Sequence, residues 1–142
     1  MPPGNDKTKI DLKGIAPLLL VFDIEASIGF YCNILGFEMA ANSSDGPRFG
    51  WVLLRLNNVE IMLEPLYPLK EQAPRPDPLR VQHHADTFLY LGCPDIDAAY
   101  DHLKSKGIPL EPPRMTYYGM KQVYFSDPDG YRICFQWPIQ AT

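Results

Sequence analysis

The amino-acid sequence predicts an α+β protein that contains two copies of one βαβββ unit. In each half of the chain, a short apolar run, an amphipathic helical stretch and three further apolar runs follow one another in the same order. The two halves also align at a single offset of 72 residues. It places Asp23-Ile24-Glu25-Ala26 on Asp95-Ile96-Asp97-Ala98 and Ile61-Met62-Leu63-Glu64 on Ile133-Cys134-Phe135-Gln136. Because one offset serves both ends of the unit, it indicates an internal duplication.

The first half begins with a strand and a helix. Residues 15–22 form a continuous apolar run, which is typical of a buried strand, and Asp23 follows as a helix N-cap. Apolar residues then recur at helical spacing as far as Leu35, and Gly36 predicts the end of the helix. Further strands are predicted at residues 37–41, 49–56 and 59–64, separated by a turn at 42–47 and a hairpin at 57–58.

A segment rich in proline separates the two halves. Five of the 15 prolines lie between Pro65 and Pro78, a density that predicts a surface connection. Strands are then expected at 87–93, 108–110, 122–125 and 131–137, with a helix from Asp95 to Gly107 and a turn at 127–130. The predicted organisation is a loose leader (1–14), a first module (15–66), the connection (67–84) and a second module (85–138).

Composition excludes several classes of protein. The 142 residues are 46% hydrophobic and 21% charged, which is ordinary for a globular core, and the net charge of −4 provides no basic surface for nucleic acid or anionic lipid. No apolar run approaches the length of a membrane span. Residues 1–13 resemble no secretion signal, and three dispersed cysteines are typical of reduced thiols, so we expect a cytoplasmic protein.

Two stretches resemble one known superfamily. The first resembles the helix signature of the vicinal oxygen chelate proteins, and it consists of Phe22-Asp23-Ile24-Glu25-Ala26-Ser27-Ile28-Gly29-Phe30-Tyr31 followed by Leu35-Gly36-Phe37. Phe125-Ser126-Asp127-Pro128-Asp129-Gly130-Tyr131 resembles the hairpin before their last strand. This superfamily comprises the glyoxalase, bleomycin-resistance and extradiol-dioxygenase proteins. The resemblance implies paired βαβββ modules whose mixed sheets curl around an open cleft, usually in a homodimer.

The resemblance also implies where a metal ion would bind. Metal-using members carry one ligand on the first and one on the last strand of each module. Those positions correspond here to Ala16, Met62, Phe88 and Cys134. Since alanine and phenylalanine offer no donor atom and Met offers only a weak thioether, this set predicts no metal and no cofactor.

Alternation along the strands names the residues that would face the cleft with these positions. The opposite set, including Leu19, Leu63 and Ile133, is apolar and would pack against the helices. The predicted lining is Trp51, Arg55, Glu64, Phe88, Tyr90, Tyr124, Arg132 and Gln136. Aromatic walls with a few charged groups favour a planar or partly cationic organic ligand.

The main hypothesis is therefore a homodimeric protein that binds a small aromatic or glycopeptide-like molecule without metal and without turning it over. One alternative is a metal-dependent lyase, isomerase or dioxygenase with a displaced ligand set of His83, His84, Asp86 and Glu64. In an extended segment, however, the neighbouring side chains of His83 and His84 would diverge. A second alternative is a metal-free enzyme that uses Glu64 as a base or Cys134 as a nucleophile.

Overall fold

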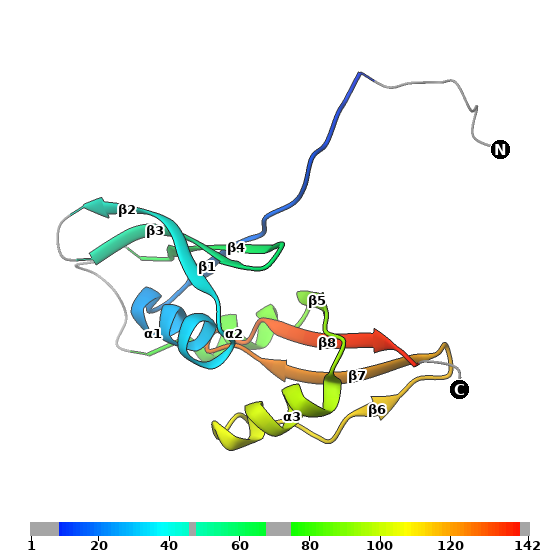
Figure 1. The fold of residues 1–142 in the computed structure, drawn as a ribbon. Helices are drawn as coiled ribbons and strands as arrows, with labels where there is room; N and C mark the ends of the chain where they lie inside the picture. The colour runs from blue at the N-terminus through cyan, green and yellow to red at the C-terminus, as the bar shows by residue number, and fades with distance from the viewer. Residues whose placement is uncertain (1–8, 46–47, 68–74, 140–142) are drawn as a thin grey trace.

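A computed structural model describes residues 9–45, 48–67 and 75–139 of the chain. It contains two βαβββ modules, as the sequence predicts, with a helix between them (Figure 1). The first module consists of β1 (Leu18–Val21), α1 (Ile24–Ile28), η1 (Gly29–Ile34), β2 (Glu38–Asp45), β3 (Arg48–Leu56) and β4 (Val59–Pro65). After α2 (Pro78–His84), the second module consists of β5 (Phe88–Gly92), α3 (Ile96–Ser105), β6 (Arg114–Met115), β7 (Met120–Ser126) and β8 (Arg132–Pro138).

Each module forms its own four-stranded mixed sheet. The strand orders are β1-β4-β3-β2 and β5-β8-β7-β6, so the first and last strands of each module pair in parallel. The register confirms the duplication, because adding 72 to both members of the Leu18–Met62 pair gives the observed Tyr90–Cys134 pair. The sheets are not closed into a barrel, which leaves one face of each open.

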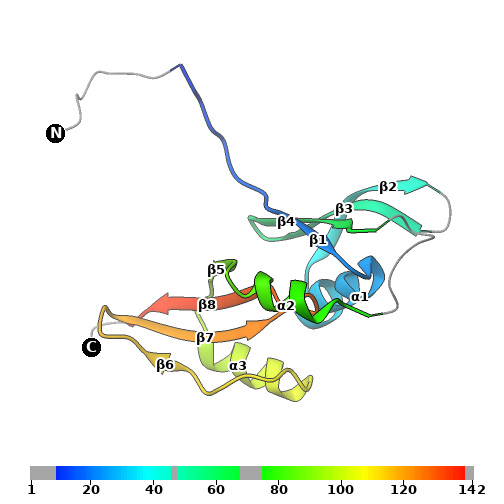
Figure 2. The ribbon, with the colours of Figure 1, turned by 180° about the vertical axis from the view of Figure 1, so that it is seen from behind.

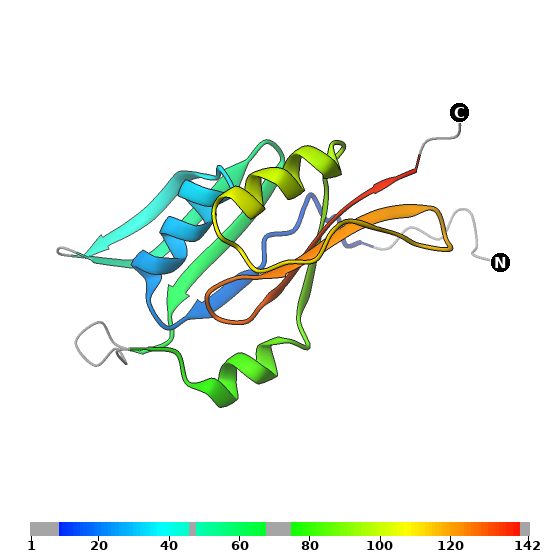
Figure 3. The same cartoon turned by 90° about the horizontal axis from the view of Figure 1, so that it is seen from below.

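In each module, a helix covers the face of the sheet that lies opposite the open face. Figure 3 shows α1 over the first sheet and α3 over the second, on the same side of the molecule. The residues predicted to face the helices lie in or against the core. Leu19, Leu63 and Ile133 belong to the buried core, and Leu89 and Phe135 are partly buried and pack against it. Asp23 and Asp95 cap the two helices, and Gly36 and Gly107 end the helical stretches with φ angles of 93° and 78°.

Four local predictions need correction. The first strand begins at Leu18, where pairing with β4 begins, and Ile15 is 88% exposed. Strand β2 continues through the predicted turn to Asp45, because an edge strand tolerates polar residues. No strand forms at 108–110, where Pro109 lacks an N–H group, and β6 forms at 114–115. The first helix changes to a π-helix at Gly29, a change that the apolar spacing does not reveal.

A fifth and larger difference lies in the segment predicted as a connection. Residues 78–84 form α2, because proline is tolerated in the first turn of a helix and the Asp77 side chain accepts a hydrogen bond from the Leu79 N–H. His83 and His84 are therefore helical, and the expectation of an extended segment is wrong. Figure 2 shows α2 at the junction of the two modules.

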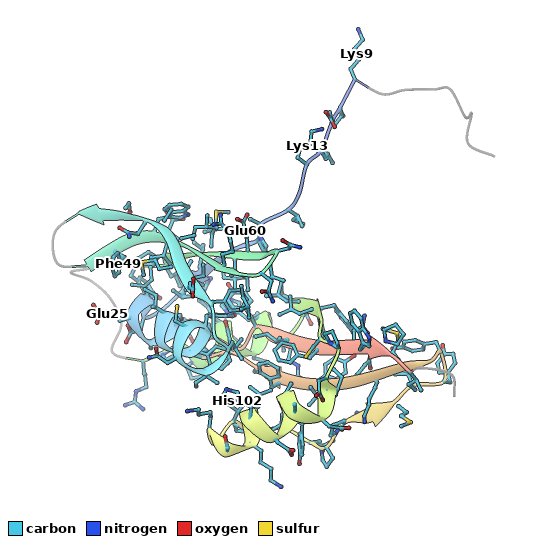
Figure 4. The ribbon with its side chains drawn as sticks, in the orientation of Figure 1. Lys9, Lys13, Glu25, Phe49, Glu60 and His102 are labelled. Carbon is cyan, nitrogen blue, oxygen red and sulfur yellow. The ribbon has the colours of Figure 1, made fainter. Side chains whose placement is uncertain are left out.

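The predicted turn at 127–130 joins the two modules. Asp129 accepts hydrogen bonds from the Phe22 N–H (2.8 Å) and the Ser27 hydroxyl (3.2 Å), and Asp127 accepts one from the Tyr31 hydroxyl (2.8 Å). These carboxylates are only 1% and 5% exposed. A second link lies on α3, where His102 Nε2 donates to the Ile34 carbonyl at 2.7 Å (Figure 4). The second module thus caps the ends of the helical segment of the first.

Candidate functional site

Aromatic side chains gather on the open face of the second sheet. Tyr90 on β5 and Tyr124 on β7 both pair in register with Cys134 on β8, so the two tyrosines lie on either side of that residue. Their hydroxyl oxygens are 2.8 Å apart. The Phe88 ring lies 6.3 Å from the Tyr90 ring and 6.2 Å from the Tyr124 ring. Three rings therefore form one apolar surface with a polar edge.

A cavity of about 1180 Å³ opens over this surface. Its walls come from β5, the 109–112 loop, β6 and β7, and Tyr117 and Tyr118 precede β7 at the turn after β6. Tyr117 is fully exposed, and its ring contacts the Tyr118 ring edge-on at 5.0 Å. The volume suits a small organic molecule.

A hydrogen-bond network connects the rings to the turn at residues 117–118. Gln122 Nε2 donates to Gln136 Oε1 (2.9 Å) and to the Tyr118 hydroxyl (3.1 Å), while the Tyr124 hydroxyl donates to Gln122 Oε1 (3.3 Å). The hydrogen bond with Tyr90, together with burial, raises the pKa of Tyr124 well above its usual range. Tyr124 is therefore a neutral phenol at neutral pH, able to donate or accept a hydrogen bond.

Arg132 supplies a cation at the edge of the aromatic surface. Its guanidinium carbon lies 6.0 Å from the centre of the Phe88 ring and 5.9 Å from that of Tyr124. Nη1 also donates to the Ser126 hydroxyl at 3.0 Å. These contacts hold the guanidinium in one orientation against the cavity wall.

Cys134 lies beneath the rings and is completely buried. Burial raises the pKa of its thiol, and the Tyr124 hydrogen bond and the Arg132 charge oppose that rise only in part. Because the thiolate is the nucleophile, this environment disfavours the predicted alternative in which Cys134 attacks a substrate.

The predicted lining divides between the two sheets. Phe88, Tyr90, Tyr124 and Arg132 line the cavity, and Gln136 is joined to it through Gln122. The remaining three, Trp51, Arg55 and Glu64, belong to the first sheet and do not line the cavity. Arg55 pairs with Glu60 at 2.7 Å. Figure 4 shows Glu60 on the first sheet. The sequence did not identify the 109–112 loop as a wall, because its position depends on how α3 packs.

The donor atoms do not fit a metal ion. Ala16 and Met62 belong to the first module and Phe88 and Cys134 to the second sheet, so neither pair offers more than one sulfur ligand. The displaced set is not brought together either: His84 Nδ1 donates to the Asp129 carbonyl at 2.7 Å, and its ring stacks on Tyr131 at 4.0 Å. Among the residues that the structure describes, no group of three His, Cys, Asp or Glu side chains could hold a metal ion.

Comparison with known proteins shows the family to which this chain belongs. Residues 14–135 match the family described as the Glyoxalase/Bleomycin resistance protein/Dioxygenase superfamily. The chain belongs to this superfamily. It is 33% identical to YaeR of Escherichia coli strain K12 over 117 residues, which cover 79% of this chain and 85% of YaeR.

Several solved structures have the same fold. A bleomycin resistance determinant encoded on transposon Tn5 is 21% identical, with a TM-score of 0.67 over 89% of this chain and 98% of that one. TnmS3, an antibiotic binding protein from Streptomyces sp. CB03234, is 23% identical, with a TM-score of 0.66 over 91% and 98%. A member of the superfamily from Sphaerobacter thermophilus DSM 20745 is 26% identical, with a TM-score of 0.65 over 88% of this chain and 97% of that one.

No helix in the described part of the chain is long and apolar enough to cross a membrane.

Proposed function

We propose that this superfamily member binds a small planar aromatic molecule in the cavity of the second module, without a metal ion and without turning the ligand over. The observation that supports this most is the chemistry of the open sheet face. At the positions where metal-using members carry their ligands, the second module has Phe88 and a buried thiol, Cys134. Aromatic rings occupy the surface that a ligand would contact.

The aromatic surface also explains how binding would be selective. The Phe88 and Tyr124 rings are perpendicular (89°), so a planar ligand can stack on one of them while its edge meets the other. The polar edge formed by the Tyr90 and Tyr124 hydroxyls can receive one hydrogen bond from it. Two proteins of the same fold are described as a bleomycin resistance determinant and an antibiotic binding protein. The proposal extends small-molecule binding to this chain, and an aromatic or glycopeptide-like antibiotic belongs to the same class of ligand.

The direct test uses a neutral probe, 2-naphthamide, and the full chain. We expect saturable binding by calorimetry and a rise in the unfolding temperature with probe concentration, because a ligand of the native state stabilises it. Tyr124→Ala removes one wall and is expected to weaken binding at least about tenfold. Tyr100→Ala, on α3 and outside the cavity, is the matched control. Unaltered binding by Tyr124→Ala, or no binding by the wild type, would contradict the proposal.

We further propose that the chain is a homodimer whose sites combine modules from two subunits. The first sheet also has an open face, where Leu18 and Leu20 are 45% and 36% exposed. Trp51 and Glu64 lie on that face, because their neighbours Val52 and Leu63 are buried in the core. A partner's first module placed over the cavity would bring the remaining predicted lining residues to the ligand.

Subunit mixing tests this arrangement. The native chain is expected to have twice its 16.1 kDa mass in light scattering. Trp51→Ala and Tyr124→Ala damage different modules, so a mixed dimer of the two variants has one intact site only if each site combines two subunits. We expect such mixtures to recover binding of 2-naphthamide. A monomer, or mixed dimers with no recovery, would refute the shared site.

We also propose a cytoplasmic location. The three cysteines are free thiols, and a reducing compartment keeps them so.

A further inference from the structure

Arg132 is a cation that has no acidic partner within 4.0 Å among the residues that the structure describes. Aromatic rings flank its guanidinium at 6.0 and 5.9 Å, and Ser126 accepts a hydrogen bond from Nη1. A guanidinium has five N–H donors in a planar fork. None of the ion pairs formed among the described residues includes Arg132. Donors therefore remain for a group that enters the cavity.

The carboxylates in the cavity wall do not neutralise this cation. Asp127 is turned into the junction of the modules, where its oxygens accept hydrogen bonds from the Tyr31 hydroxyl and from the backbone N–H groups of Asp129 and Tyr131. Glu111 lies on the 109–112 loop and is exposed to solvent. Arg114 adds a second cation to the wall.

The position of Arg132 relative to the rings defines the shape of a fitting ligand. Because the guanidinium carbon lies 6.0 and 5.9 Å from the centres of the Phe88 and Tyr124 rings, an aromatic ligand that packs on these rings can present a substituent to Arg132. A carboxylate or sulfonate on that ring would receive charge-assisted hydrogen bonds from the planar fork. A cationic substituent at the same place would meet a like charge in a partly desolvated site.

We infer that the ligand is a planar aromatic anion, whose rings pack on Phe88 and Tyr124 while its acidic group pairs with Arg132. This inference rests on the proposed aromatic site and names its ligand class. It replaces the partly cationic ligand that the sequence favours, because the charged side chain that contacts the Phe88 and Tyr124 rings is the Arg132 cation.

Three probes of nearly equal shape test the charge preference: 2-naphthoate, 2-naphthamide and 2-naphthylmethylammonium. We expect the wild-type protein to bind the acid about tenfold more tightly than the amide, as one charge-assisted hydrogen bond predicts, and the ammonium probe least tightly. This preference is expected to shrink when the salt concentration is raised, since salt screens the charges. The wild-type comparison decides the question without any variant.

Substitutions then assign the preference to one side chain. Arg132→Gln is expected to bind the acid and the amide equally, whereas Arg132→Lys keeps part of the preference because it keeps the charge. Arg75→Gln, at an exposed position ahead of α2, is the matched control and should behave as the wild type. Thermal unfolding of each variant shows that it is folded.

The outcomes separate this inference from the proposed function. If the wild type binds the amide as tightly as the acid, or prefers the ammonium probe, the anionic ligand class is wrong while the aromatic site stands. The same holds if folded Arg132→Gln keeps the full preference for the acid. If none of the three probes binds, the proposed function fails and the inference fails with it.

Discussion

The buried carboxylate of Asp127 makes the stability of the fold depend on pH in a direction opposite to the usual one for a carboxylate in an ion pair. Burial is the largest cause that raises its pKa, from 3.8 to about 6, against the hydrogen bond from Tyr31, which lowers it. The native state therefore holds the proton more tightly than the unfolded chain. Stability from this group is fully present below about pH 4 and is lost as the pH rises through about 6.

The magnitude follows from the shift. Each pKa unit corresponds to about 1.4 kcal/mol, so Asp127 is expected to cost about 1 to 3 kcal/mol of stability at pH 7.5 relative to pH 4. Asp127→Asn removes the titration but keeps an oxygen for the two backbone N–H groups. The variant should therefore gain stability relative to the wild type by that amount as the pH rises.

Urea unfolding monitored by tryptophan fluorescence measures this difference between pH 4 and pH 7.5. Asp101→Asn, an exposed position on α3, is the control and should follow the wild type at every pH. If the Asp127→Asn and wild-type stabilities run parallel across this range, or if the wild type gains on the variant as the pH rises, the account of the junction is wrong.

Two further predictions concern single side chains. Cys134 is expected to react with iodoacetamide at pH 7.5 at least about tenfold more slowly than the partly exposed Cys32 and Cys93. Burial raises the pKa of all three thiols, so the difference comes from access to Cys134, which is completely buried. Peptide mapping by mass spectrometry measures the rates, and equal rates would count against a buried thiol. Gly130→Ala should destabilise the fold by about 2 kcal/mol or more, because Gly130 has a φ of 89° and a Cβ there would collide with the Val81 carbonyl on α2. Gly107→Ala has a similar φ of 78° but open space around the added Cβ, so it should cost less in the same urea titration; equal costs would mean that α2 does not pack on the turn.

The fold was predictable because the repeat leaves a direct trace in the sequence. Identical spacing of apolar runs around Asp23 and Asp95 fixed the order of elements, and the 72-residue offset reproduced the pairing of β1 with β4 and of β5 with β8. The π-helix was not predictable, since its apolar residues recur at spacings that also fit an α-helix. The density of prolines does not reveal helix α2, because proline disrupts the interior of a helix but is tolerated in its first turn, where Pro78 lies.

The site was predictable where strand alternation determines it. Phe88, Tyr90, Tyr124 and Arg132 come together because period two places them on the open face of one sheet. The Gln122 network depends on the turn that brings Tyr118 back over β7, and the sequence shows only that an aromatic loop is present there. Likewise, the buried role of Asp127 and Asp129 is invisible in a motif whose residues also suit an ordinary turn.

Binding of an aromatic ligand in this cavity without a metal ion can be tested by one calorimetric comparison. Protein purified without chelator is first analysed for zinc, nickel, manganese and iron, and the binding of 2-naphthamide is then measured before and after dialysis against EDTA. We expect far less than one ion per chain and the same dissociation constant in both states. One tightly held ion per chain, or binding that is lost with EDTA and restored by a metal, would contradict it.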